Sequence, residues 1–137
     1  DAVFVADTGN HRIRRLELSG DDVVTGVVDV IGTGEAASSG DGTPARVFPV
    51  EAPRGLAFDP FGDLVVTATR TGFRVIAYAA VCVDGSGAVF TLYGAVPRDS
   101  FPEDSTFCLS GVEVEAADRV RVVDACQGYL LELQRTP

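Results

Sequence analysis

Apolar residues recur at every second position through most of the chain, in short runs. The run VFVAD at 3–7 and the run RIRRLEL at 12–18 show this alternation, and clusters of Gly, Asp and Pro separate such runs. An apolar period of two bounded by turn residues is typical of antiparallel strands. No segment shows a convincing helical period. The pattern therefore predicts an all-β protein.

The alternating runs also repeat along the chain. Residues 53–69 and 109–125 align without a gap, and the apolar positions are kept while the residue types change. The opening run aligns over residues 3–16 with 120–133 without a gap, and over residues 3–18 with 64–78 after one inserted residue. Such self-similarity is typical of repeat folds. The chain therefore holds three copies of one unit, whose four strands we name a to d.

The first copy lacks strand a and the third lacks strand d. The predicted strands are 3–7, 12–18 and 23–31 in the first copy, 55–59, 64–68, 74–82 and 88–93 in the second, and 111–115, 120–124 and 129–134 in the third. Four short antiparallel strands per unit are typical of β-propeller blades. The predicted blades are 1–34 without its first strand, 53–94 complete, and 109–135 without its last strand. Because they cannot close a ring, we expect the remaining blades from the same longer chain or from another chain.

A hairpin in the third copy allows its register to be predicted. Pairing Val114 with Val120 places Val112 opposite Val122 on the same face of the sheet. The other face then carries two acid–base pairs, Glu113 with Arg121 and Glu115 with Arg119. Opposite charges that face each other across strands stabilise a sheet by about 0.2–1 kcal/mol per pair.

The same register, extended beyond the hairpin, concerns the three cysteines. It brings Cys108 opposite Cys126, at a separation that a disulfide can span. Cys82 would then be unpaired, and the compartment would be oxidising. The alternative is that Cys108 and Cys126 are buried free thiols.

Two stretches carry a resemblance to a known family. VFVADTGNHRIRRL (3–16) and SGDGTPARVFPVEAPRGLAFDPFGDLVV (39–66) resemble the NHL-repeat family of β-propellers. The resemblance implies a propeller, six-bladed in the full protein, in an extracellular or envelope-exposed bacterial protein. It also implies that ligands bind on one rim or in the central channel. The chain departs from the family pattern in two copies. The position of the second copy that corresponds to Asp7 is Ala68, and in the third copy CQGY replaces the Asn-His-Arg run.

The b–c turns and the d–a loops of blades share one rim, which is the candidate binding site. Its candidate residues are His11, Asp41, Arg54 and Arg70. His11 is the only histidine of the chain, and a metal site or a general base would need companions, so we expect a turn residue with a solvent-facing ring.

Structural roles are expected for the neighbouring charged residues. Asp7 and Asp124 open b–c turns and should accept backbone N–H groups across them. Alternation sends Arg12 and Arg14 to one face of their strand and Arg15 to the other, so the three do not form one patch. A solvated or inter-blade salt-bridge role is favoured for them over anion binding. Asp59 and Asp63 flank the turn DPFGD and are interpreted as turn residues.

Charge and motifs favour a binding function. The net charge of −9 disfavours binding to nucleic acids, and no run of apolar residues is long enough to span a membrane, so membrane insertion is not expected. No catalytic residue, metal site or cofactor motif is predicted. The leading hypothesis is a non-enzymatic scaffold that presents its rim to a protein, peptide or glycan. The alternative is a propeller hydrolase or lyase whose channel metal is held mainly by other blades; RNA binding, known for other family members, is disfavoured by the charge.

Overall fold

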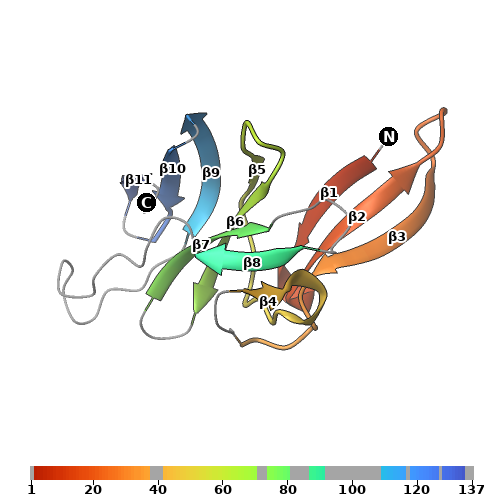
Figure 1. Ribbon diagram of the computed structural model, residues 1–137, viewed down its shortest axis with the longest axis horizontal. Coiled ribbons are helices and arrows are strands. Elements are labelled where there is room, and N and C mark those ends of the chain that lie inside the picture. Colours follow the sequence, from red (N-terminus) through yellow and green to blue (C-terminus); the bar gives the residue numbers. More distant parts are fainter. Residues whose placement is uncertain are drawn as a thin grey trace.

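The chain folds into three antiparallel β-sheets that lie side by side (Figure 1). The computed structural model describes residues 2–37, 42–70, 74–80, 87–91, 109–116, 118–126 and 128–134. Within these ranges the helical elements are two single turns of 3-10 helix, η1 (Thr8–Asn10) and η2 (Ala45–Val47). No helix of this part has the length and apolar character of a membrane span. The predicted all-β class is confirmed.

Each sheet holds the strands of one of the three predicted copies. The first sheet is β1 (Ala2–Asp7), β2 (Arg12–Leu18) and β3 (Val24–Ile31), in that order. The second sheet has the order β4-β8-β7-β6-β5, with β4 (Thr43–Pro44), β5 (Leu56–Phe58), β6 (Leu64–Arg70), β7 (Arg74–Ala80) and β8 (Ala88–Thr91). The third sheet has the order β11-β10-β9, with β9 (Leu109–Ala116), β10 (Arg119–Asp124) and β11 (Tyr129–Gln134).

All ten predicted strands are present, with bounds that differ by a few residues. One further strand, β4, was not predicted. It pairs with the outer strand β8 through Thr43 and Pro44. Proline cannot donate to a ladder and is tolerated at an edge, so a two-residue edge strand gives no alternating pattern to detect. The strands are confirmed, whereas their grouping as blades of a ring stays a prediction.

The main core lies between the first and second sheets. The first sheet contributes Ile13 and Ile31, and the second contributes Leu64 and Val66, all at most 4% exposed. Phe48 follows η2 and fills the space beside them. These side chains come from alternate positions of their strands, which is how a period of two places one apolar face of each sheet against the other.

The other face of the second sheet packs on the third sheet. Thr67 is fully buried there, and its hydroxyl donates to the carbonyl oxygen of Ser110 at 3.1 Å. The same Oγ1 accepts the backbone N–H of Gly55 at 2.9 Å. A Cβ on Gly55 would overlap the Ser110 carbonyl and lie 3.1 Å from Cγ1 of Val112, so only glycine fits this approach. The middle sheet is thus covered on both faces, as its apolar residues predict.

The register of the third sheet is confirmed at its centre and shifts at both ends. Val120 pairs with Val114, and Val122 pairs with Val112. Beyond them the register shifts, so Arg119 lies opposite Ala116 and not opposite Glu115, but the predicted ion pair of Arg119 with Glu115 is present at 3.7 Å. Arg121 does face Glu113, but its ion pairs are with Glu115 at 2.7 Å and Glu132 at 4.0 Å. Long side chains reach diagonal neighbours, which is why charge partners differ from directly opposed residues.

The predicted cysteine pairing falls partly outside the described residues. Cys126 lies in the turn after β10 and is disulfide-bonded. Cys108, its predicted partner, and Cys82 lie outside the described residues, so the pairing stays a prediction. The ladder between β9 and β10 ends with a shifted pair, Leu109 with Asp124, and the simple extension of the central register does not continue past it.

Candidate functional site

The candidate rim is built where the β1–β2 turn meets the segment that leads into β5. Strands β1 and β2 are joined by η1 and by His11, whose backbone is left-handed with φ of 53°. Residues 48–55 run past this turn before β5 begins, and Ala52 within them also has a positive φ of 43°. Two non-glycine residues with this conformation at one place indicate a local structure held by its contacts.

Two hydrogen bonds join the turn to this segment. The imidazole Nδ1 of His11 accepts the backbone N–H of Ala52 at 3.0 Å. The hydroxyl of Thr8 donates to the carbonyl oxygen of Pro53 at 2.6 Å. An accepting Nδ1 carries no proton, so the neutral imidazole has its hydrogen on Nε2. The expectation of a solvent-facing ring is therefore wrong, because His11 is half-buried and satisfies a backbone group of another segment.

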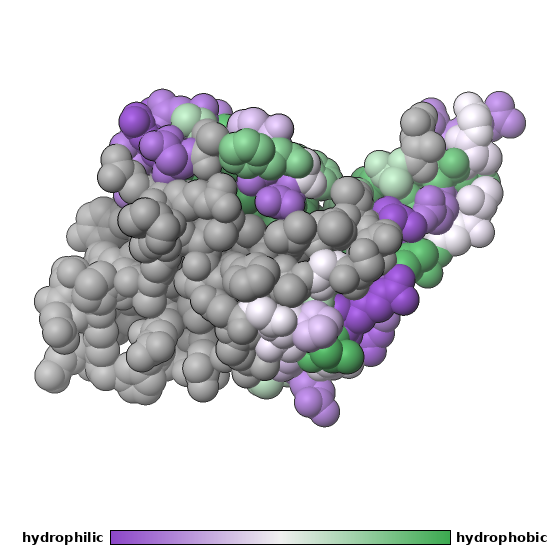
Figure 2. Space-filling model, viewed as in Figure 1, coloured by the Kyte–Doolittle hydropathy of each residue, from purple (hydrophilic) through white to green (hydrophobic). Residues whose placement is uncertain are grey.

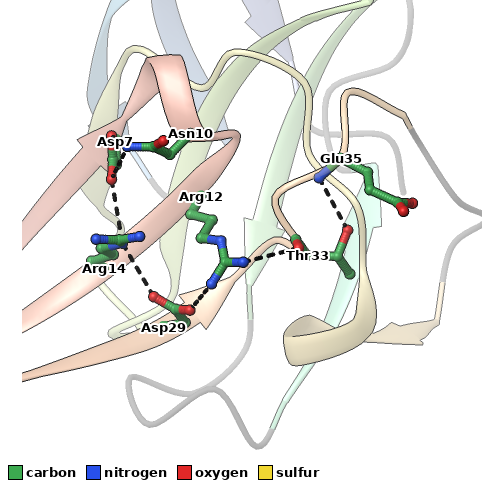
Figure 3. Close-up of polar contacts among 7 residues, drawn as sticks. All are labelled: Asp7, Asn10, Arg12, Arg14, Asp29, Thr33 and Glu35. Carbon is green, nitrogen blue, oxygen red and sulfur yellow. Dashed lines mark hydrogen bonds and ion pairs between the residues drawn. The ribbon is translucent and has the colours of Figure 1, made fainter.

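The face of β2 beside this turn carries a network of ion pairs (Figure 3). Nε of Arg14 lies 3.3 Å from Oδ2 of Asp7 and 3.2 Å from Oδ1 of Asp29. Arg12 also pairs with Asp29, and its second amino group donates to the carbonyl of Thr33 at 3.1 Å. The network therefore links all three strands of the first sheet to the loop that follows β3.

The arginines of β2 are engaged within the protein. Side chains of Arg12, Arg14, Asp7 and Asp29 are 24–40% exposed, a range in which ion pairs contribute about 1 kcal/mol or less each. Arg15, on the other face, pairs with Glu17 at 2.6 Å. The predicted separation of the three arginines between two faces is confirmed. The salt bridges named above lie within the first sheet, whereas the prediction was of salt bridges between blades.

The two turn aspartates behave differently. Asp124 is fully buried, and its Oδ1 accepts the backbone N–H of Cys126 at 3.1 Å, as predicted. Asp7 makes no capping hydrogen bond to the backbone of η1. Its carboxylate instead accepts the side-chain amide of Asn10, at 2.8 and 3.0 Å. The predicted backbone role of Asp7 is therefore wrong, although the residue still closes its turn.

Asp59 has the expected turn role at the far end of the second sheet. Its Oδ1 accepts the backbone N–H groups of Phe61 at 2.8 Å and Asp63 at 2.9 Å. Gly62 has φ of 88° and donates its N–H to the carbonyl of Asp59 at 3.1 Å. The stretch DPFGD is thus a β-turn held by its first aspartate.

The other predicted rim residues are only partly placed. Arg54 is exposed, and its backbone N–H donates to the carbonyl of Thr67 at 3.0 Å, immediately before β5. Arg70 is the last residue of β6, opposite Arg74. Asp41 lies outside the described residues. His11 and Arg54 are therefore brought to the same segment, since the 48–55 segment contacts one and contains the other.

Sequence reasoning missed three residues that build this site. Asp29 has a detectable signal, because the β2–β3 hairpin register places it opposite Arg14. Ala52 and Thr8 have none, because a backbone N–H and a turn hydroxyl acquire their partners only when segments 41 and 45 residues apart meet. Among the described residues, no group of three or more His, Cys, Asp or Glu side chains lies close enough together to hold a metal ion.

Comparison with known proteins adds no family assignment. No protein-family model matches the chain, and a search of curated proteins finds no significant match.

Proposed function

We propose that this chain is part of an NHL-like β-propeller that acts as a non-enzymatic recognition scaffold for a protein, peptide or glycan. Support comes from three antiparallel sheets that repeat one strand order and stack face to face. The resemblance of 3–16 and 39–66 to NHL repeats supports the same fold. With the predicted disulfide, it also supports an extracellular or envelope-exposed bacterial protein.

The observation that carries the proposal is the way the candidate rim is held. Two hydrogen bonds fix the 48–55 segment against the first sheet, one accepted by His11 and one donated by Thr8, and the N–H of Arg54 fixes the end of the segment against the second sheet. The side chain of Arg54 is exposed on this supported backbone. A surface that is ordered before binding loses less entropy when a ligand binds.

The proposal is tested by measuring ligand binding to the 137-residue chain. Peptide and glycan arrays would identify a ligand, and calorimetry would compare the wild type with Arg54→Ala. We expect the substitution to weaken binding about tenfold, because an arginine at a binding surface commonly contributes more than about 1 kcal/mol.

Arg119→Ala is the matched control, since it removes the same charge from the β9–β10 end of the third sheet. Arg119 there faces Glu115 and Glu132 at 3.7 Å each. Affinity should be unchanged by this variant. Equal losses for Arg54→Ala and Arg119→Ala, or the absence of any ligand on the arrays, would count against the rim as a recognition surface.

A further inference from the structure

The only histidine of the 137-residue chain lies in a contact between distant parts of the fold. Nδ1 of His11 accepts the backbone N–H of Ala52 at 3.0 Å, and the two residues are 41 positions apart in the sequence. Histidine is the side chain whose charge ordinarily changes between about pH 5 and pH 8. A change of charge in that range therefore falls on a single side chain, at the place where the 48–55 segment meets the first sheet.

The hydrogen bond to Ala52 requires a neutral imidazole. A neutral ring with its hydrogen on Nε2 has a lone pair on Nδ1, and this lone pair accepts the N–H of Ala52. When a proton from solvent binds to Nδ1, both ring nitrogens become donors and no acceptor remains. Two donors that face each other cannot form a hydrogen bond. Protonation of His11 and its contact with Ala52 therefore exclude each other.

The backbone of Ala52 depends on the contacts that surround it. Its φ is 43°, in the left-handed region that residues with a Cβ rarely occupy. Such a conformation persists where neighbouring groups impose it. The hydrogen bond to His11 is one of the contacts that do so. Loss of this bond therefore favours the return of Ala52 to a more common backbone conformation.

Two fixed points confine this change to a short stretch of the segment. Before Ala52, the side chain of Val50 is 1% exposed and belongs to the core between the first and second sheets. After it, the carbonyl oxygen of Pro53 accepts the hydroxyl of Thr8 at 2.6 Å. Neither contact involves a group that titrates between pH 5 and pH 8. We therefore expect residues 51 and 52 to change while the residues on either side stay in place.

Charged side chains of both signs surround the turn and the segment. They are Asp7 of β1, Arg12 and Arg14 of β2, Asp29 of β3, Glu35 of the loop that follows β3, and Glu51 and Arg54 of the 48–55 segment. Figure 2 shows hydrophilic side chains at the surface of the first sheet, at the right of the view. Within the described residues, none of the ion pairs involves His11. The half-buried ring is therefore open to protons from solvent and is not held in one charge state by a paired neighbour.

We propose that His11 is a pH-dependent latch for the 48–55 segment. The latch is closed when the ring is neutral and Nδ1 accepts the N–H of Ala52. It opens when the ring takes up a proton in mild acid, which releases residues 51 and 52. The stability that the contact contributes is present above the pH at which the ring is protonated and is lost below it. The rim is thus ordered at neutral pH and locally loosened in mild acid.

The consequence of the latch for binding rests on the proposed function. A ligand that binds the ordered rim should bind more weakly in mild acid, because residues 51 and 52 must then be ordered at the moment of binding. The latch itself needs no ligand. It can therefore be tested on the chain alone.

Hydrogen exchange of the 137-residue chain, followed by NMR, measures the latch directly. Protection of the Ala52 N–H, relative to an unstructured chain at the same pH, should fall about tenfold or more between about pH 7.5 and about pH 5.5. The nitrogen shifts of the ring should report hydrogen on Nε2 alone at the higher pH and on both nitrogens at the lower one. The Thr67 N–H donates to the backbone carbonyl of Gly55 at 3.0 Å, so its protection should not change.

Two variants separate the acceptor at position 11 from its charge. His11→Asn supplies Oδ1, an acceptor that takes up no proton in this range, so Ala52 should stay protected at both pH values. His11→Ala supplies no acceptor, so exchange at Ala52 should be fast at both. The wild type should therefore resemble the asparagine variant at neutral pH and the alanine variant in mild acid.

Three results would overturn the latch. The first is protection of Ala52 in the wild type that does not change with pH, and the second is an equal fall in His11→Asn, which would assign the change to another group. The third is a hydrogen on Nδ1 at neutral pH. Should His11→Asn fail to fold, the wild type decides alone, because the ring shifts and the protection of Ala52 must change together. No ligand is used, so failure of the latch and failure of the rim to bind a ligand are separate results.

Discussion

At the scale of single residues, His11 has a structural task that its sequence neighbourhood does not reveal. It adopts a left-handed backbone conformation, with φ of 53°, and turns its Nδ1 toward the N–H of Ala52. The Oδ1 of asparagine occupies the same position along a side chain as Nδ1 of histidine, and asparagine is among the residues that tolerate this conformation. The role of His11 as an acceptor can therefore be separated from its role as an imidazole.

Replacement of His11 tests this role. His11→Ala should lower the free energy of unfolding by about 1–2 kcal/mol, because it leaves the Ala52 N–H without its partner. His11→Asn should retain most of the stability. Urea unfolding measures both, and hydrogen exchange at Ala52 should be faster in the alanine variant alone. Equal losses in the two variants would show that the hydrogen bond contributes little.

At the scale of an element, β2 separates an apolar face from a charged one. Ile13 is fully buried in the core between the first two sheets, whereas Arg14, the next residue, lies among half-exposed carboxylates. Apolar burial yields far more free energy than an exposed ion pair. The apolar face of β2, which carries Ile13, should therefore contribute more to the stability of the protein than the charged face, which carries Arg14.

Substitutions at these neighbouring positions should differ in effect. Ile13→Ala should destabilise the protein by about 2–5 kcal/mol, because it removes buried methyl groups and leaves a cavity. Arg14→Ala should cost about 1 kcal/mol or less, and that loss should shrink at high salt as the ion pairs are screened. Chemical unfolding at low and high salt measures both. A larger loss for Arg14→Ala would show that the charged network holds the sheet.

At the scale of the whole molecule, the stacking of the sheets depends on close approach at a few points. Gly55 and Thr67 form one such point, where the second sheet meets the carbonyl of Ser110 in the third. Backbone atoms cannot move aside as a flexible side chain can. The spacing between these two sheets is therefore set by the absence of a side chain at Gly55.

Gly55→Ala should therefore destabilise the stack by about 1–3 kcal/mol through overpacking. Gly20→Ala is the control, because a Cβ at Gly20 meets nothing within 4 Å. Its effect should stay within about 0.5 kcal/mol. Thermal unfolding compares the two variants. A neutral Gly55→Ala would show that the second and third sheets can separate slightly without loss of stability.

Much of the fold was predictable from the sequence because the signal is local. A period of two places Val112 and Val114 on one face, and a short turn then fixes their partners, so the central register of the third sheet was predicted. The same reasoning separated Arg12 and Arg14 from Arg15. It failed for the register at Arg119, because a shift at the end of the ladder depends on how the turn closes, although the predicted ion pair of Arg119 with Glu115 does form.

The candidate site was predictable only in outline. His11 and Arg54 were assigned to one rim by the order of the strands, and both do meet the 48–55 segment. The partners of His11 and Thr8 were not predictable, because they are backbone groups of residues distant in the chain. Any residue type offers such groups, so the sequence carries no mark of which one is used.

By itself, the sequence determined the class of the fold, the positions of the strands and which face of each strand is apolar. These follow from the alternation of side chains along an extended backbone, which is a property of neighbouring residues. Only the tertiary structure decided the partners between sheets: Ala52 for His11 and Ser110 for Thr67. Those contacts depend on how whole sheets approach one another, and no local pattern encodes that distance.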